Sequence, residues 1–523
     1  MKSNLFEKWG KWLILIAVVL GLSMDLLDMT IVNVAIPKIM LQFGTDLRLS
    51  QYIVTAYMIT IGVFEPITAY LADTRGMKKI YLLSLFIFTG GSVLSALSWN
   101  INALIFFRIV QAVGGGMIMP LALSIVEKTF TKKELPLAMG LMGIPLLIAP
   151  AIGPTIGGYL VEYYSWKMIF WINLPIGLLA IYFSYLFLHE FETVTKKFDF
   201  WGFILSAVGF STLLLALSNG TDEGWTSFNI VFLFYIAGSS LLLFFLVEAH
   251  VTDPILDLRI FKNRIYSASL VVTFFIIMSL FGSLFILPLF LQQLKGLGAM
   301  DTGLMLLPEV LGIIVFLPLS AILLPRIGAT ILTIAGILLM SVGSSFFINL
   351  QMNTDIHMID KYLMIVGAGL GLGIMPSVTL AYSSLPEDLV NQGSAFFNMV
   401  RQVGSAFGVA ILTSIIQQRT PWHYAHLADT ATPWSHTVQA LEPLTSYFQG
   451  LGFLAPEAQQ LSLLNLFKLA QEKAAVLAFQ DAFHANMILG LLGILPALFL
   501  FQKPILTMIT NCVPKNKQNL SGK

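Results

Sequence analysis

The chain has 523 residues, of which 57% are hydrophobic and only 11% are charged. This composition excludes an ordinary water-soluble protein and predicts an all-α polytopic membrane protein. The formal net charge of +1 and the lack of a long basic run give no reason to expect nucleic-acid binding. The single cysteine, Cys512, cannot form an internal disulfide, and its isolation does not indicate a metal site.

Apolar stretches follow one another along almost the whole chain, and each long one predicts a membrane-spanning helix of about 20 residues. The first stretch follows Lys2, Lys8 and Lys11 but runs on to Pro37, which is too long for a cleaved signal peptide, so we expect it to remain as a span. In chain order we predict about fourteen spans, at roughly residues 12–37, 52–72, 79–98, 102–127, 135–160, 166–188, 200–219, 229–249, 268–293, 303–324, 328–350, 358–382, 394–418 and 483–503.

The basic residues of the loops predict the orientation of these spans. Lysine and arginine gather at the N-terminus and in alternate loops, for example at Lys79, Lys133 and Arg264, and are fewer in the loops between. Because loops rich in Lys and Arg stay on the cytoplasmic side, we expect both termini in the cytoplasm, which agrees with an even number of spans.

One predicted loop, 419–482, is far longer than the others and lies on the extracytoplasmic side. It holds several prolines and a helical stretch, Glu457–Phe479, with an apolar side. We keep three alternatives: a cap over the outer vestibule, a docking surface for a partner, or a packed segment without a partner. His423 and His426 share a helix face, but no acidic or cysteine ligand accompanies them, so we expect no metal there.

Ionisable side chains inside the predicted spans are the best indication of function, because a charge at bilayer depth is costly unless it is paired or wetted. Such residues usually mark a path for a substrate or a proton. They are Asp25 and Asp28 in the first span, Glu65 in the second, Arg108 in the fourth, Glu309 in the tenth and Arg401 in the thirteenth.

A rise of about 1.5 Å per residue places Asp28 and Arg108 at compatible depths in the outer half of the membrane. We therefore predict a contact between them, direct or through water. Gln111 lies three residues after Arg108 on the same helix face. The alternative is that Asp28 only caps or packs at a helix kink.

A carboxyl group shielded from water can hold a proton at neutral pH and release it when a cation approaches. Such groups allow exchange of a substrate for a proton without covalent chemistry. Asp28 and Glu65 are our first candidates, followed by Asp25 and Glu309, although Glu309 lies near a helix end where it could simply be solvated. For Arg401 we weigh a role in gating against hydrogen bonding to a helix end.

The loop after the second span has the sequence Ala69-Tyr-Leu-Ala-Asp-Thr-Arg-Gly-Met-Lys-Lys79. It resembles the loop signature of the major facilitator superfamily, G-x-L-A-D-R-x-G-R-K, and departs from it at Ala69 and Met77. The cluster is expected to latch one conformation by bridging to a neighbouring helix; the alternative is anchoring by positive charge alone. Its members are Asp73, Arg75, Gly76, Lys78 and Lys79.

The fifth span carries small residues and prolines that let two helix backbones approach and bend. The string G-P-x-x-G-G resembles the antiporter signature of drug exporters in the same superfamily; ordinary small-residue packing is the alternative. The residues are Pro150, Gly153, Pro154, Gly157 and Gly158.

Three further segments, Leu27–Pro37, Trp166–Pro175 and Asn398–Gly404, resemble the fourteen-span drug:proton antiporter branch with its EmrB-type multidrug exporters. The resemblance covers nearly the whole chain. It implies the major facilitator fold, with a six-helix bundle at 12–188, two inserted helices at 200–249 and a second six-helix bundle at 268–503. It also implies the cytoplasmic (inner) membrane, and possible partners in a periplasmic adaptor protein and an outer-membrane channel. The expected substrate path comprises Asn33, Gln111, Asn398, Arg401 and Gln402.

The function that these features predict is export of amphipathic drugs across a lipid bilayer, driven by a proton gradient and needing no cofactor. The 40 Phe and 22 Met residues offer adaptable apolar walls for varied small molecules. A nucleotide-driven pump is disfavoured because the chain lacks a G-x-x-x-x-G-K-[ST] phosphate loop. The alternative is a dedicated exporter of one metabolite, such as a siderophore; a membrane-embedded enzyme is disfavoured because no catalytic constellation is present.

Overall fold

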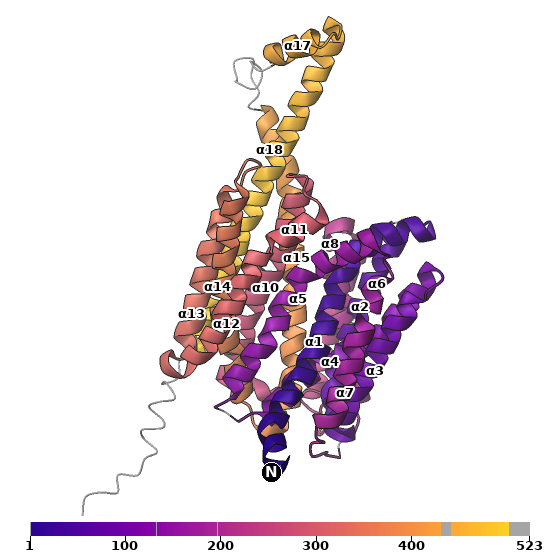
Figure 1. Ribbon diagram of the computed structural model, residues 1–523, viewed down its shortest axis with the longest axis vertical. Helices are drawn as coiled ribbons and strands as arrows, with labels where there is room; N and C mark the ends of the chain where they lie inside the picture. Colours follow the sequence, from indigo (N-terminus) through magenta and orange to yellow (C-terminus); the bar gives the residue numbers. More distant parts are fainter. Residues whose placement is uncertain (1, 46, 132, 196, 430–440, 501–523) are drawn as a thin grey trace, which may run out of the picture.

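The computed structural model describes residues 2–45, 47–131, 133–195, 197–429 and 441–500 (Figure 1). Within these ranges the regular structure is helical, without a strand, as the composition predicts. The helices up to the middle of the chain are α1 (Lys2–Phe43), α2 (Leu47–Arg75), α3 (Met77–Ala96), α4 (Ile101–Thr129), α5 (Leu135–Tyr163), α6 (Met168–Trp171), α7 (Asn173–Phe187), α8 (Phe200–Glu223) and α9 (Phe228–Glu248).

A short linker with the 3-10 helix η1 (Leu258–Lys262) leads into the second half of the chain. Its helices are α10 (Arg264–Gln293), α11 (Ala299–Met305), α12 (Leu307–Ile327), α13 (Ala329–Phe346), α14 (Ile356–Ser383), α15 (Val390–Asp429), α17 (Leu441–Gly450), α18 (Ala455–Leu492) and α19 (Ile494–Ala497), with 3-10 turns η2 (Phe347–Asn349), η3 (Glu387–Leu389) and η4 (Leu498–Leu500).

Thirteen helical segments of the described residues are long and apolar enough to cross a membrane. The 29-residue helix α5, in which some side chains are not described, is a further helix of comparable length. Three predicted spans are interrupted; the last of them, 483–503, divides at Gly493, between α18 and α19. The span 166–188 divides at Ile172, because Pro175 cannot donate to the carbonyl of Trp171. The span 303–324 divides at Leu306 in the same way, before Pro308.

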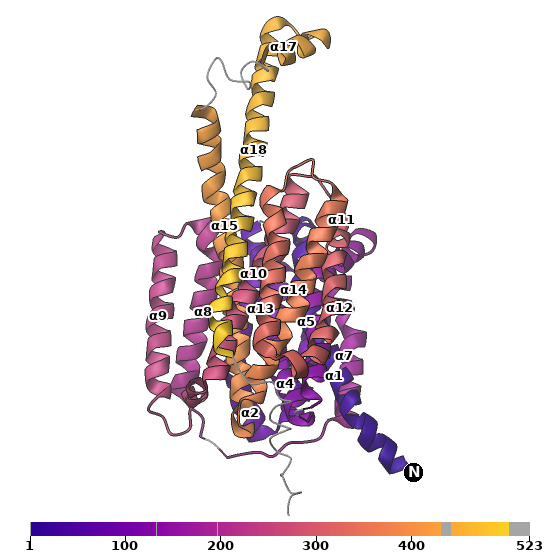
Figure 2. The same ribbon diagram turned by 90° about the vertical axis from the view of Figure 1, so that its left-hand side faces the viewer.

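The helices form two bundles with a pair of helices beside them. Within the first bundle α1 packs on α5 and α7, and α4 on α2 and α3; within the second, α14 packs on α12 and α13, and α15 on α10 and α18. Helix α5 meets α11 and α12 across the interface, and α15 meets α2 and α4. The inserted pair is central in the sequence but lies at the side of the molecule in Figure 2, where α8 packs on α9, α2 and α15.

The prediction that residues 419–482 form a loop separate from the neighbouring spans is wrong, because the helices of both spans extend into this region. Helices α15 and α18 contain 40 and 38 residues, so each is about 60 Å long and far exceeds the roughly 30 Å hydrocarbon layer. The predicted stretch Glu457–Phe479 continues without a break into the last span, because no proline or glycine lies between them. The two helices project from the bundles with α17 at the tip, as a stalk rather than a cap over the vestibule (Figures 1 and 2).

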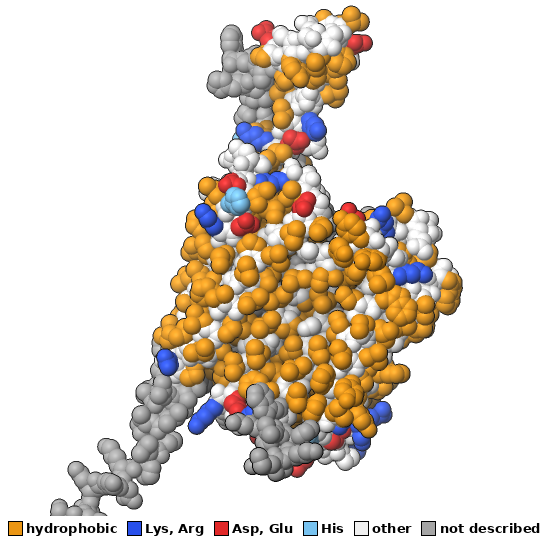
Figure 3. All heavy atoms as spheres, viewed as in Figure 1, with side chains coloured by type: hydrophobic (Ala, Val, Ile, Leu, Met, Phe, Trp, Pro, Cys, Tyr) orange, Lys and Arg blue, Asp and Glu red, His pale blue; other side chains and the backbone are white. Residues whose placement is uncertain are grey.

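The surface agrees with a membrane-embedded molecule. On the face shown in Figure 3, hydrophobic side chains form a broad band around the bundles, and charged groups lie above and below it. Helix α9 shows this most clearly, because Phe228, Tyr235 and Leu242 expose more than half of their surface. Such side chains are stable when they face lipid and costly when they face water.

Close glycine contacts hold the second bundle together. A Cβ atom added to Gly367 on α14 would lie 2.0 Å from the backbone oxygen of Glu309 on α12. The glycine run 367–373 therefore serves close helix packing.

We expect Gly367→Ala to lower the free energy of unfolding by about 1–3 kcal/mol, because the obstructing atom belongs to the backbone and cannot turn aside. Gly90→Ala is the matched control, since a Cβ there has no neighbour within 4 Å. Thermal unfolding of the two purified variants in detergent measures the difference. Equal melting temperatures would mean that the α12–α14 contact is not tight.

Candidate functional site

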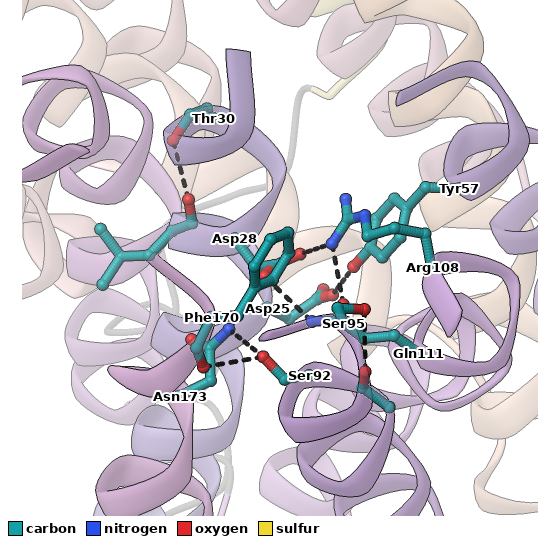
Figure 4. A network of polar contacts seen from close by, with 12 residues as sticks. Asp25, Asp28, Thr30, Tyr57, Ser92, Ser95, Arg108, Gln111, Phe170 and Asn173 are labelled. Carbon is teal, nitrogen blue, oxygen red and sulfur yellow. Dashed lines mark hydrogen bonds and ion pairs between the residues drawn. The ribbon is translucent and has the colours of Figure 1, made fainter. Parts of the chain in front are cut away.

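Asp28 and Arg108 form a buried ion pair between α1 and α4, so the contact predicted from depth is confirmed (Figure 4). Arg108 Nη1 donates to Asp28 Oδ2 and to Gln111 Oε1, the latter at 2.9 Å. Gln111 Nε2 in turn donates to Asp28 Oδ1 at 2.9 Å. The Arg108 side chain is only 1% exposed and that of Asp28 is fully buried. The pair therefore neutralises two charges that neither lipid nor bulk water solvates.

The break between α6 and α7 brings two more polar groups to Asp28. Asn173, the first residue of α7, donates through Nδ2 to Asp28 Oδ1 at 2.8 Å and to Ser92 Oγ at 2.9 Å. The Ser92 hydroxyl donates to the carbonyl of Phe170. Asp28 thus accepts hydrogen bonds from three different side chains and joins α1, α4 and α7.

Asp25 lies one turn before Asp28 on α1 and faces Tyr57 of α2. The Tyr57 hydroxyl donates to Asp25 Oδ1 at 2.9 Å, and the guanidinium of Arg108 lies 3.9 Å from the centre of the Tyr57 ring. Gly115 leaves room for this contact, because a Cβ at that position would lie within 2.9 Å of both oxygens. No cation pairs directly with Asp25 among the described residues.

Glu65 and Arg401 lie in different bundles, on α2 and α15, and are 2% and 5% exposed. Each is ten or eleven residues from the adjacent helix end, Arg75 or Val390, which places both at about 15 Å from that end. Each is the largest electrostatic partner of the other, and Asp25 contributes to both. In the described structure the two charges do not form an ion pair within 4 Å, and Arg401 Nε has no hydrogen-bond partner.

The remaining predicted residues differ in their burial and in their hydrogen bonds. Glu309 on α12 is buried at 3% exposure and its Oε1 has no partner within the described residues, so solvation at the surface is excluded. Asn398 is buried and donates to the carbonyl of Ser394 on its own helix, and Gln402 is buried nearby. Asn33 is exposed and joins none of these groups, so its predicted place in a substrate path has no support from the geometry.

The Asp73 loop contacts the second bundle. Asn391, at the start of α15, donates through Nδ2 to Asp73 Oδ1 at the end of α2. Lys78 donates through its backbone N–H to Glu190 Oε1 at 2.9 Å. The Glu190 carboxylate occupies the space beside Gly76, whose φ of +99° also favours glycine.

Two basic residues of this loop, Arg75 and Lys79, are exposed. Neither makes an ion pair with the part of the chain that the structure describes.

We expect Asp73→Ala to loosen this contact between the bundles, because it removes a hydrogen bond to a charged group worth about 1.5–3 kcal/mol. The labelling rate of a cysteine placed at Met142, between the bundles, should rise roughly tenfold with a maleimide reagent in a Cys512→Ser background. Arg75→Ala is the control, since Arg75 is exposed and lies in the same loop. Equal labelling in both variants would contradict a latch.

The glycines of the fifth-span motif lie against α1. A Cβ on Gly153 would meet Thr30 Oγ1 at 2.0 Å, and one on Gly157 would meet Ile31 Cγ1 at 2.7 Å. Gly158 faces the start of α11, at 3.9 Å from the backbone nitrogen of Met300. Pro154 is half-buried, and the side chain of Pro150 lies outside the described residues. The motif thus lets α5 pack closely on the helix that carries Asp25 and Asp28.

A cavity between the two bundles has a volume of about 10 Å³, which is near the minimum for one water molecule. A drug-sized ligand needs several hundred Å³, so this cavity must widen before such a ligand can enter it. The cavity is lined by Leu22, Met119, Leu123, Met139, Met142, Gly143, Met375, Val378 and Phe397.

Two helical bundles with a lipid-facing surface and a charged network buried inside the first bundle indicate a multi-pass membrane transporter. Residues 18–409 match the Major Facilitator Superfamily, and the chain belongs to that superfamily.

The chain is 32% identical over 524 residues to the multidrug transporter protein MdtP of Bacillus subtilis, covering 97% of this chain and 95% of that protein. It is 31% identical over 490 residues to the uncharacterized MFS-type transporter YhcA of the same organism, covering 93% and 92% of the two chains. The structure of the human organic anion transporter MFSD10 shares the fold, with a TM-score of 0.57, 13% identity and coverage of 92% of this chain and 99% of that one.

Proposed function

We propose that the chain is a proton-coupled exporter of amphipathic drugs. The observation that supports this most is the placement of Glu65 and Arg401, two buried opposite charges on opposite bundles that do not touch. A nearby cation favours the loss of a proton from a carboxyl group. If the bundles rock against each other, the distance between Arg401 and Glu65 changes, and the proton affinity of Glu65 changes with it.

The other buried acids have different roles in this proposal. Asp28 is saturated by Arg108, Gln111 and Asn173, so it serves mainly to hold Arg108 in place. Asp25 is buried and accepts a hydrogen bond from Tyr57, with no directly paired cation among the described residues, so it is a second proton carrier in this proposal. Glu309 is a further candidate because it is buried without a cation.

The proposed substrates are amphipathic because the cavity between the bundles is lined by apolar side chains, while the neighbouring stretch of α15 carries buried polar ones. Four methionines line the cavity there, and their flexible side chains adapt to ligands of different shape. Relatives such as MdtP and the lincomycin resistance protein LmrB of Listeria monocytogenes carry names that support drug export. Asn398, Arg401 and Gln402 are the proposed polar contacts for the substrate. A dedicated exporter of one metabolite remains the second candidate.

The test combines two measurements. A strain without the gene is profiled for susceptibility to unrelated toxic compounds, and substrate accumulation in inverted vesicles is followed with an imposed proton gradient. We expect increased susceptibility to several amphipathic compounds and accumulation that stops when an ionophore collapses the gradient. Sensitivity to a single compound would favour the dedicated exporter, and accumulation without a gradient would exclude proton coupling.

We further propose that the protein lies in the cytoplasmic membrane with both termini inside, and that the stalk faces outward. The stalk exposes apolar side chains, including Tyr447, Leu454, Leu464 and Phe467, that suit an adaptor protein which leads on to an outer-membrane channel. A cysteine at Ser446 in a Cys512→Ser background should react with an impermeant maleimide on intact cells. Cross-linking from the same position identifies an adaptor; a protected cysteine would place the stalk inside.

A further inference from the structure

Two buried acidic side chains outside the central network lie at the ends of the inserted helices. Asp199 precedes α8 and Glu248 is the last residue of α9, and they are 8% and 3% exposed. Asp199 Oδ1 accepts from the backbone N–H of Gly202 at 2.9 Å. Asp199 Oδ2 and both oxygens of Glu248 have no hydrogen-bond partner among the residues described.

Gly202 brings the two carboxyl groups together. A Cβ atom at this position would lie 2.4 Å from Asp199 Oδ2 and 2.7 Å from Glu248 Oε1. The two oxygens therefore share the space that the missing side chain leaves open. Two carboxylates so close together and so buried cannot both remain charged. A single proton between them supplies the donor that both oxygens lack.

The helix ends decide which residue carries this proton. Asp199 caps the N-terminus of α8, where the helix dipole favours a negative charge. Glu248 lies at the C-terminus of α9, where the dipole disfavours one. Asp257 in the linker adds another negative charge nearby and is itself paired with Arg259, whose side chain is largely exposed. These surroundings favour a proton on Glu248.

We propose that Glu248 is a proton-binding site, sharing its proton with Asp199, which responds to the proton concentration at this face of the membrane. When the proton leaves, the backbone amides of Ile255 and Leu256, which face Glu248, can receive its carboxylate. The site is separate from the Glu65 and Arg401 region, and its proton binding does not depend on the proposed export activity.

The linker after α9 connects this site with the start of α15. The backbone N–H of Asp257 donates to Gln392 Oε1 at 3.0 Å. The neighbouring residue Asn391 is the one that holds Asp73. A change in the position of the linker therefore acts directly on the contact between the two bundles. This effect on transport, unlike proton binding itself, rests on the proposed function.

The test is the infrared spectrum of the purified full-length protein in the region of protonated carboxyl groups. We expect Glu248→Gln to remove one protonated-carboxyl band, and the matched exposed substitution Glu223→Gln, at the other end of α8, to leave the spectrum unchanged. Asp199→Asn should shift the band, because the acceptor changes from a carboxylate to an amide, and should make it disappear at a lower pH, because the neighbouring negative charge is removed. Asparagine is also a good N-cap, so Asp199→Asn should fold. Its spectrum therefore reports on the Glu248 band even if Glu248→Gln fails to fold.

An unchanged spectrum in Glu248→Gln, or a band whose position and pH dependence stay unchanged in Asp199→Asn, would overturn the assignment. In vesicles, Glu248→Gln imitates the protonated state, and we expect the dependence of transport on the pH of that face to flatten. A wild-type pH dependence in a variant that has lost the band would overturn the regulatory part alone. If transport proves not to be coupled to protons, the infrared result for Glu248 still stands. The proposal of proton binding at Glu248 and the proposal of proton-coupled export can therefore fail separately.

Discussion

Arg108→Ala is expected to destabilise the protein by about 3–5 kcal/mol and to abolish transport, because it leaves the carboxylate of Asp28 buried without its cation. The loss extends beyond one ion pair. Arg108 also donates to Gln111 and lies over the ring of Tyr57, so its removal disturbs α1, α2 and α4 together. Thermal unfolding in detergent and drug accumulation in vesicles measure the two effects.

The double variant Arg108→Ala with Asp28→Asn separates stability from function. It removes the orphaned charge, so most of the lost stability should return, and the two substitutions should be strongly non-additive. Transport should not return, because the network is no longer charged. Arg264→Ala is the control, since Arg264 is an exposed arginine at the start of α10. Arg108→Ala protein that unfolds and transports as the wild type does would show that the ion pair is dispensable.

The sequence was sufficient to predict the Asp28–Arg108 contact because depth along a helix follows directly from residue number. The rotation of each side chain about the helix axis also follows from residue number, and it excludes Asn33 from the face that carries Asp28. Asn33 lies five positions after Asp28, which corresponds to about 140° of rotation, so the two cannot share a face. Its exposed position follows from this geometry.

Other parts of the site depend on packing between distant segments. Asn173 donates to Asp28, which is 145 residues away in the sequence, and to Ser92, which is 81 residues away. Two features of the sequence point to Asn173. It lies in the segment Trp166–Pro175, which resembles the drug:proton antiporter branch, and it is a polar residue in an apolar region. Glu248 is an ionisable residue at the end of the predicted span 229–249, but its partner Asp199 and the contact of Tyr57 with Asp25 had no signal, because one sequence does not show which helices are neighbours.

The stalk shows a different limit. Hydropathy ends a predicted span where polar residues begin, whereas a helix ends only where backbone hydrogen bonding stops. Between Pro456 and Leu492 no residue interrupts that bonding, so α18 crosses the predicted boundary at 483. Asp481 accepts from Arg419 Nε at 2.6 Å and lies 2.9 Å from His423 Nε2, which joins α18 to α15 where the stalk begins.

Glu65→Gln is expected to uncouple transport from the proton gradient. The substitution keeps the size of the side chain and removes its ability to bind and release a proton, so uphill drug accumulation should fall by about 10- to 100-fold. Binding of an uncharged substrate should change little, because Glu65 makes no hydrogen bond in the described structure. Glutamine leaves Arg401 without its nearest counter-charge, so a modest loss of stability is also expected.

The measurement compares accumulation driven by a proton gradient with exchange of substrate at equal concentrations on both sides. A proton carrier predicts loss of the first and retention of the second in Glu65→Gln, because exchange does not require net proton movement. Glu162→Gln is the matched control, since Glu162 is an exposed acid at the end of α5. If both activities disappear together, Glu65 holds the structure or the substrate rather than the proton. If both persist, Asp25 or Glu309 must carry it, and the distance between Arg401 and Glu65 has no role in coupling.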